Sequence, residues 1–222
     1  MRRLLLIGVV VLVALASSAA AGAGNVNRHI IQDSFSGDTI DPDLFFVWTN
    51  QPDNVSISQH EGAATVAVAA GATNDVSAGL FTRCQVQGDF DARLAFRLPL
   101  WPLQNGLTVS LLVPDGGYNA YRVSWQFGSG DMYAAWPNQI GTPVDASGDT
   151  GTLRLTRTGS VWAGYYLLGD QWVQLSSGPG PTRDETINLT VFNLSGVLPF
   201  GGQAATIQFN RFQVVADGIN CP

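Results

Sequence analysis

The segment from Gly88 to Leu98 has an apolar side chain at every second position. These apolar residues are Phe90, Ala92, Leu94, Phe96 and Leu98. Asp91, Arg93 and Arg97 stand between them. Because successive side chains of a strand point to opposite faces, the pattern predicts a β-strand with one apolar and one polar face. The apolar face should pack into a core, and the polar face should meet water or a ligand.

Short segments of this kind recur along the chain, separated by Gly, Pro, Asn and Asp. The clearest are 55–59, 64–70, 79–86, 90–98, 107–113, 121–127, 153–158, 161–167, 172–175, 187–192 and 205–215. Many short strands at such spacing predict a β-sandwich or barrel. Turn residues at 158–160 and 169–170 predict two hairpins, and therefore a three-stranded meander over 153–175.

The N-terminus has the pattern of a signal peptide that forms a short helix. Arg2 and Arg3 precede an apolar run over 4–16, and small residues follow. The run is shorter than the roughly 20 residues of a membrane-spanning helix. We therefore expect a signal peptide over 1–23, one domain over 24–222, and no membrane insertion after cleavage. The alternative is an uncleaved N-terminal anchor.

The charge of the chain bears on its partners. The net charge is −6, and removal of Arg2 and Arg3 would make it −8. Nucleic-acid binding requires neutralisation of phosphates by cations, so we expect no nucleic-acid partner. The sequence contains no lysine, which excludes a lysine base or Schiff base.

Cys84 and Cys221 are the only two cysteines. In an exported chain two cysteines usually pair, so we expect a disulfide that ties the C-terminal tail to a strand. The alternative is two separate thiols. Export itself places the protein outside the cytoplasm: released, periplasmic or on the cell surface.

Several segments, taken in order, resemble the concanavalin A-like, laminin-G-like jelly-roll domains of bacterial exported proteins. They are Asp33–Gly37, Ile40–Pro42 with Trp48, Gly88–Phe90, Tyr118–Val123, Leu153–Arg157, the Tyr165/Trp172 hairpin and Phe209–Val214. The resemblance covers about residues 30–216. It implies an all-β fold of two stacked, curved antiparallel sheets. Its members include lectins, glycan-binding modules, glucanases, lyases and adhesion domains, so the fold alone does not decide function.

The resemblance also implies a structural calcium ion near the junction of the first and last strands. Asp33 and Asn210 stand where oxygen ligands would be expected. Calcium takes six to eight oxygens, and the sequence does not present a full set. The alternative is that both side chains only satisfy backbone groups at strand ends. We expect no cofactor to be required.

The carboxylates do not form the pattern of a glycosidase. Glucanases of this fold carry Glu-x-Asp-x-Glu or a near variant, which supplies two carboxylates for acid and nucleophile. This chain has only Glu61 and Glu185, both in predicted turns, and Asp89 beside Asp91 fits turn chemistry. No histidine lies in the central strands, where a lyase of this fold would use one. We therefore predict no catalytic residues.

Two polar strand faces are the candidate ligand site. One is the polar face of 90–98, and the other belongs to 121–127, opposite Trp125, which we expect in the core. Trp162 and Tyr166 should be exposed if Val161 and Tyr165 are buried, and Trp172 should close its hairpin on the core. The candidate ligand-contacting residues are Asp91, Arg93, Arg97, Arg122, Gln126, Trp162 and Tyr166. Arginines in such a groove suit an acidic or hydroxyl-rich glycan. The alternative is a solvated, self-paired surface.

These observations favour an exported, non-catalytic β-sandwich that binds an extracellular glycan or a cell-surface protein. Two alternatives remain: a structural or adhesive protein without a small-molecule site, and a divergent glycan-active hydrolase or lyase.

Overall fold

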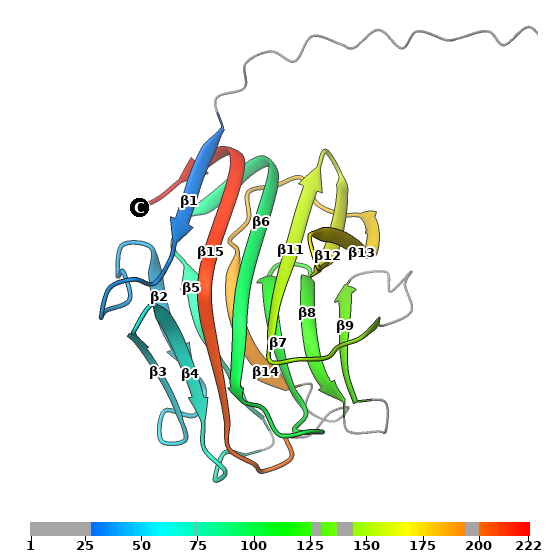
Figure 1. Cartoon of the computed structure of the whole chain (residues 1–222). Coiled ribbons are helices and arrows are strands. Elements are labelled where there is room, and N and C mark those ends of the chain that lie inside the picture. Colours follow the sequence, from blue (N-terminus) through cyan, green and yellow to red (C-terminus); the bar gives the residue numbers. More distant parts are fainter. Residues whose placement is uncertain (1–27, 74, 126–129, 137–143, 194–199) are drawn as a thin grey trace, which may run out of the picture.

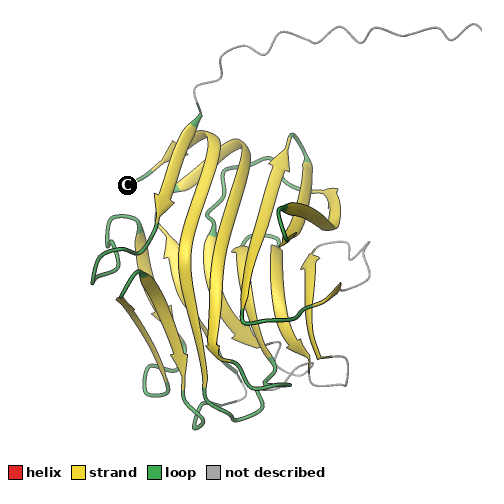
Figure 2. Ribbon diagram, viewed as in Figure 1, coloured by secondary structure: helices red, strands yellow, loops and turns green. Residues whose placement is uncertain are grey.

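The computed structural model describes residues 28–73, 75–125, 130–136, 144–193 and 200–222. Every regular element in these ranges is a β-strand (Figure 2). The strands form two antiparallel sheets, one behind the other (Figure 1). Within the described ranges, no segment forms a helix with the length and apolarity needed to cross a bilayer. The predicted signal peptide over 1–23 and its helix lie outside the described residues.

The first sheet has eight strands in the order β13-β12-β11-β6-β15-β4-β3, and β1 also pairs with β15. Their bounds are β1 His29–Asp33, β3 Val55–His60, β4 Ala63–Val68, β6 Gln85–Leu100, β11 Thr150–Thr158, β12 Val161–Leu168, β13 Gln171–Pro179 and β15 Ala205–Asn220. The two long strands β6 and β15 lie side by side at its centre (Figure 1).

The second sheet has seven strands in the order β10-β9-β8-β7-β14-β5-β2. Their bounds are β2 Phe45–Thr49, β5 Ser77–Thr82, β7 Leu107–Val113, β8 Tyr118–Trp125, β9 Gly130–Trp136, β10 Val144–Asp145 and β14 Asn188–Asn193. The predicted all-β, two-sheet sandwich is thus confirmed. The strands β1, β2, β9 and β10 were not among the segments that alternation picked out.

The main core lies between the two sheets. Strand β6 supplies it with the five apolar residues of the alternating segment, all of them at most 3% exposed. They face buried side chains of the second sheet such as Val109, Leu111 and Leu189. Asp91, Arg93 and Arg97 point away from this core, as the alternation predicts. Strand β6 therefore has one face in the core and one free outer face.

The predicted meander is confirmed. Strand β11 pairs with β12 and β12 with β13, all antiparallel. Gly159 and Gly169 take positive φ values in the two hairpin turns, a conformation that glycine adopts without strain. The register of β12 on β13 shifts between Gly164 and Tyr165, which marks a bulge.

The predicted disulfide is confirmed: Cys84 and Cys221 are bonded. Cys84 is 1% exposed and belongs to the main core. Pairing between β6 and β15 continues to Gln85 opposite Asn220, directly beside the bond. The disulfide therefore fixes the C-terminal end of β15 to the start of β6.

Candidate functional site

The outer face of the eight-stranded sheet carries a carboxylate held by two arginines. Asp91 of β6 accepts hydrogen bonds from Nε and Nη2 of Arg93, at 3.0 and 2.8 Å. It accepts the same pair of bonds from Arg154 of β11, at the same distances. Arg93 and Arg154 are direct cross-strand neighbours, where like charges repel. Asp91 offsets that repulsion and fixes both guanidinium groups on the outer face.

An indole completes this cluster. Trp172 of β13 has the guanidinium carbons of Arg93 and Arg154 at 5.6 and 5.4 Å from its ring centroid. Both distances lie within cation–π range. Arg154 also lies 5.1 Å from the ring centroid of Tyr165. The prediction that Trp172 closes its hairpin on the core is therefore wrong: its ring packs among cations on the outer face.

A shallow trough crosses the sheet beside this cluster. Arg211 of β15 pairs with Ala95 of β6, and Ala95 pairs with Thr152 of β11. Leu167 of β12, which pairs with Trp172 of β13, continues this row across the sheet. Small side chains in the middle of this row and long ones at its ends leave a hollow. The hollow has a volume of about 260 Å³ and is lined by Arg93, Ala95, Thr152, Trp172, Arg211 and Gln213.

A second hollow, of about 460 Å³, continues the first and shares Ala95 and Thr152 with it. Its further lining includes Arg97, Thr150 and Asn210. Asn210 lies at a register shift of β15 on β6, and its buried Oδ1 accepts no hydrogen bond. We call the two hollows together the arginine trough.

The arginine trough is a cationic region of an acidic chain. Four arginines lie on the outer face of strands β6, β11 and β15, namely Arg93, Arg97, Arg154 and Arg211. Asp91 is the carboxylate that hydrogen-bonds among them. The net charge of the whole chain is −6, so this local excess of positive charge opposes the overall balance. Such a face attracts anions.

The pKa of Asp91 lies below 3.8, its ordinary value. Burial raises it, but the hydrogen bonds and charges of Arg93 and Arg154 lower it by more. A depressed carboxyl pKa stabilises the fold above the unfolded-state pKa, and this contribution disappears as pH falls through the folded-state pKa. We expect Asp91→Asn to lower the free energy of unfolding at neutral pH, and the loss to shrink and vanish as the pH falls through the depressed folded-state pKa of Asp91. Urea titrations of both proteins across pH measure this. A pH-independent difference would contradict the ionic role of Asp91.

The structure does not bring Arg122 to the polar face of β6, so this part of the predicted groove is wrong. Strand β8 belongs to the other sheet, and Arg122 points from it into the space between the sheets. Tyr121, Val123 and Trp125 form a small separate cluster away from the main core. Both faces of β8 are buried, so alternation could not tell which face is inner. Gln126 lies outside the described residues.

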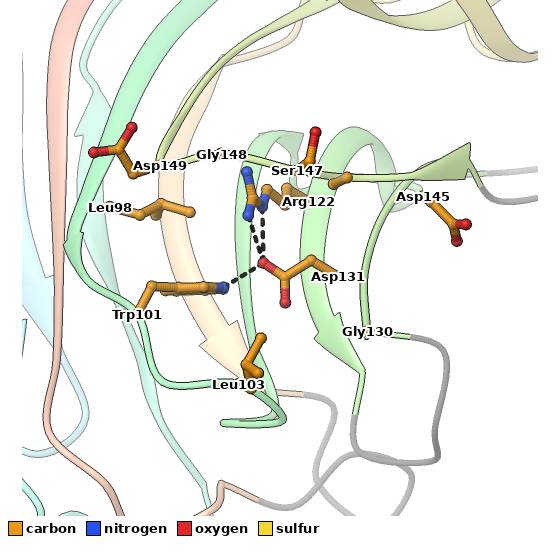
Figure 3. A pocket seen from close by; sticks show the side chains of 11 residues that line it. Leu98, Trp101, Leu103, Arg122, Gly130, Asp131, Asp145, Ser147, Gly148 and Asp149 are labelled. Carbon is orange, nitrogen blue, oxygen red and sulfur yellow. Dashed lines mark hydrogen bonds and ion pairs between the residues drawn. The ribbon is translucent and has the colours of Figure 1, made fainter.

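Arg122 instead forms a buried ion pair with Asp131 of β9. Its Nε and Nη2 donate to Asp131 Oδ2 at 3.1 and 2.5 Å, and the two side chains are 3% and 4% exposed. The indole of Trp101 donates to the same oxygen at 2.7 Å. Figure 3 shows the three groups converging on that atom. The Arg122 guanidinium also lies 5.9 Å from the ring centroid of Tyr133.

The ion pair forms the floor of a cavity of about 440 Å³ between the sheets. Its walls are Leu98, Trp101, Leu103, Gly130, Asp145, Ala146, Ser147, Gly148 and Asp149. The backbone N–H of Leu98 donates to Asp149 O at 2.7 Å, which anchors the segment that leads into β11 across the end of β6. We call this cavity the inter-sheet pocket (Figure 3).

Trp162 and Tyr166 are not exposed, so their prediction as ligand contacts is wrong. They are 1% and 5% exposed. The Trp162 ring stacks on Tyr118 with centroids 4.4 Å apart, and its indole donates to Pro181 O at 3.0 Å. Tyr166 stacks on Tyr133 at 4.7 Å. The rings of Trp162 and Tyr166 fill the space between the sheets, and Val161 points outward and is 51% exposed.

The predicted calcium ligands Asp33 and Asn210 have different surroundings. Asp33 Oδ1 accepts the backbone N–H of Phe35 at 2.6 Å, as a side chain at a strand end does. Asn210 lines the arginine trough. Across the described part of the chain, no three His, Cys, Asp or Glu side chains gather as metal ligands. The geometry therefore fits the backbone-capping alternative for Asp33.

The two glutamates do not form a catalytic pair either. Glu185 is 3% exposed and accepts a hydrogen bond from Arg183 Nε at 2.9 Å. Burial raises the pKa of Glu185, and the Arg183 hydrogen bond partly offsets that rise. Glu61 lies in the turn between β3 and β4, with a positive φ of 51°. The two residues thus serve different structural elements.

Sequence reasoning missed Arg154, Arg211, Trp172 and Asp131. Arg154 alternates with apolar residues as Arg93 does, and that signal was available in its own strand. Arg211 has the parity of the buried Phe209 and faces outward only because the register shifts between these two residues, which alternation does not reveal. The position of Trp172 depends on the register of β13 on β12, which the sequence does not reveal. Asp131 follows a glycine and fits turn chemistry as well as it fits a buried ion pair.

No protein-family model matches the chain, and no curated protein matches it by sequence. Solved structures match nearly its whole length. A structure from work on endo-acting O-glycanases of human gut microbiota that initiate mucin breakdown has a TM-score of 0.59 at 13% identity, and the match covers 84% of this chain and 98% of the other. An immunostimulatory antigen and pseudo β-1,3-glucanase of Mycobacterium tuberculosis gives 0.58 at 11% identity, covering 84% and 98%.

The carbohydrate recognition domain of Emp47p has a TM-score of 0.56 at 12% identity, covering 90% of this chain and 99% of that domain. At such identities the likeness concerns the fold alone. Together with the two antiparallel sheets, it shows that this chain has the concanavalin A-like jelly-roll fold.

Proposed function

We propose that this protein is an exported, non-catalytic carbohydrate-binding protein, and that its ligand is an acidic glycan held in the arginine trough. The observation that carries the proposal is the convergence of Arg93, Arg211 and Trp172 on a hollow with a floor of small side chains. Glycan sites combine aromatic surfaces with a few polar groups of fixed orientation. The disulfide supports export, because such bonds persist in oxidising compartments.

The geometry suits a sugar that carries carboxylate or sulfate groups. The exposed guanidinium groups of Arg97 and Arg211 can each donate two parallel hydrogen bonds to such a group. The Asp91 carboxylate holds Nε and Nη2 of Arg93, and Arg93 also lines the hollow. The Trp172 ring offers an apolar surface for sugar CH groups.

Removal of one trough arginine should weaken binding to an acidic polysaccharide. We expect Arg93→Gln and Arg211→Gln each to raise the Kd for polygalacturonate by about ten- to hundredfold, because a hydrogen bond to a charged group contributes about 1.5–3 kcal/mol. Affinity should also fall with added salt, since the exposed arginines are screened. Isothermal titration at two salt concentrations measures both effects.

The matched control is Arg28→Gln, which removes the same charge from an exposed position just before β1. Its Kd should equal that of the unaltered protein. Equal binding of a neutral dextran, or unchanged Kd values in both trough variants, would disprove the arginine trough as the glycan site. Release of reducing ends or unsaturated products from the polygalacturonate would refute the non-catalytic role.

A further inference from the structure

Strand β2 is an open, apolar edge of the seven-stranded sheet. It lies at the left side of the sandwich in Figure 1, and among the described strands it pairs only with β5. Phe46, Val47 and Trp48 are 42%, 45% and 44% exposed. The strand has no charged residue, proline or glycine, and its register on β5 has no shift. Proteins usually protect an edge with such features, because an open edge can pair with another chain.

The strands at the other ends of the two sheets have this protection. Strand β10 is 2 residues long. Strand β13 ends in Gly178 and Pro179. Strand β3 carries the exposed polar residues Ser56, Ser58 and His60. Among the four end strands of the described sheets, β2 is therefore the one suited to pair with a further strand.

The hydrogen bonds at both ends of β2 show which backbone groups point to the open edge. The N–H of Arg83, on the β5 side, donates to Leu44 O at 2.9 Å. The N–H of Asn50 donates back to Ser77 O at 3.0 Å. Successive residues of a strand direct their backbone groups to opposite sides, so the even-numbered residues of β2 bond to β5. The odd-numbered residues therefore direct their N–H and C=O groups to the open edge.

A second copy of β2 offers groups that match these. When the two strands run antiparallel about Val47, its N–H and C=O bond to those of Val47 in the second copy. On either side of this pair, the Thr49 N–H of one copy donates to Phe45 O of the other. The Phe45 N–H takes no part, because it donates to Asp41 O at 2.9 Å. The edge is thus complementary to itself, as a two-fold dimer requires.

The same register brings aromatic side chains together on the outer face of the sheet. Phe46 lies opposite Trp48 of the second copy, in the class of cross-strand pair whose side chains are closer. Within each copy, Phe81 of β5 stacks on Phe46 with ring centroids 5.1 Å apart. Phe81 also meets Trp48 edge-on at 5.9 Å. Cross-strand aromatic pairs stabilise antiparallel strands, so the dimer covers an exposed aromatic surface.

The charges permit this pairing although the chain has a net charge of −6. Strand β2 itself is uncharged. Asp43 precedes it, and the pairing places this carboxylate near the neutral Gln51 of the second copy. Like charges are therefore not opposed within the paired strands or next to them.

We infer that two copies of this protein associate through their β2 strands about a two-fold axis at Val47, which joins their seven-stranded sheets into one. Because this axis is perpendicular to the sheet, the arginine troughs of both copies face the same way. Two paired strands of 5 residues form a contact below the size of a stable interface, so the dimer should be reversible, with a micromolar Kd. The dimer does not depend on the proposed glycan binding.

Sedimentation equilibrium from about 1 to 300 µM should show a reversible monomer–dimer equilibrium. Val47→Pro removes the N–H at the axis, which points away from β5, so proline leaves the pairing with β5 intact. This variant should raise the dimer Kd by about ten- to hundredfold. The matched control is Ile57→Pro in β3. The Ala69 N–H donates to Asn54 O, so by the same alternation the Ile57 N–H also points to an open edge, and its loss should leave the Kd unchanged.

A cross-link tests the register independently of any loss of stability in the proline variants. Val47→Cys places two thiols at the axis, where Cα atoms of such a pair lie about 5.5 Å apart, within disulfide range. Mild oxidation should yield a covalent dimer on a non-reducing gel, while Ser56→Cys, at an exposed position of β3, stays monomeric. A monomer at every concentration up to about 300 µM would overturn the inference. Equal cross-linking of both cysteine variants, or an unchanged Kd in a folded Val47→Pro protein, would overturn it too.

Discussion

Replacement of both cysteines by alanine should lower the free energy of unfolding by about 3–5 kcal/mol. The bond closes a loop with a sequence separation of 137 residues. In the chain-entropy account, a loop of that length restricts the unfolded state by up to about 5 kcal/mol. For a domain of this size the melting temperature should fall by roughly 6–20 °C. Calorimetry of Cys84→Ala/Cys221→Ala against the oxidised protein measures the effect.

The matched control is the unaltered protein in reductant, which opens the same loop and keeps both side chains. Cys84 is buried in the main core, so alanine there also leaves a small cavity that the reduced protein lacks. The reduced protein should therefore be slightly more stable than the double variant. A loss below about 1 kcal/mol in both would mean that residues 84 and 221 stay close in the unfolded chain.

The fold could be predicted because its signals are local. Alternation in β6 places Phe90 and Leu94 in the core, and glycine at 159 sets a hairpin. Prediction of the candidate site requires the pairing of strands, which alternation does not give. Whether Arg93 lies beside Arg154 or Arg122 depends on which strands share a sheet. The sequence does not show which of two distant strands pairs with β6.

In a strand that is buried on both faces, alternation also fails to predict which side chains point inward. Tyr121 and Val123 look like core residues and Arg122 like a surface residue, yet Arg122 is the inward side chain. Its charge is tolerated there because Asp131 on the neighbouring strand neutralises it. Similarly, Trp162 follows the exposed Val161, because ring stacking on Tyr118 outweighs the preference of valine for the interior.

The second large effect concerns the buried ion pair at the floor of the inter-sheet pocket. Arg122→Met should lower the free energy of unfolding by about 3–5 kcal/mol, because it leaves the Asp131 charge buried without its partner. Arg93→Met is the matched control. Arg93 pairs with Asp91 too, but its side chain is 44% exposed, so its loss should be below about 1 kcal/mol. Urea unfolding at neutral pH measures both.

Removal of both charges should behave differently from removal of one. Arg122→Met/Asp131→Leu should be within about 1 kcal/mol of the unaltered protein or more stable, since the cost of burying two charged groups disappears with them. The Trp101 indole, which is only partly buried, can then donate to water in the pocket. A double variant as unstable as Arg122→Met would show that the pair itself stabilises the fold. A recovered double variant would mean that the ion pair contributes little net stability, and that the loss in Arg122→Met comes from the unpaired Asp131 charge.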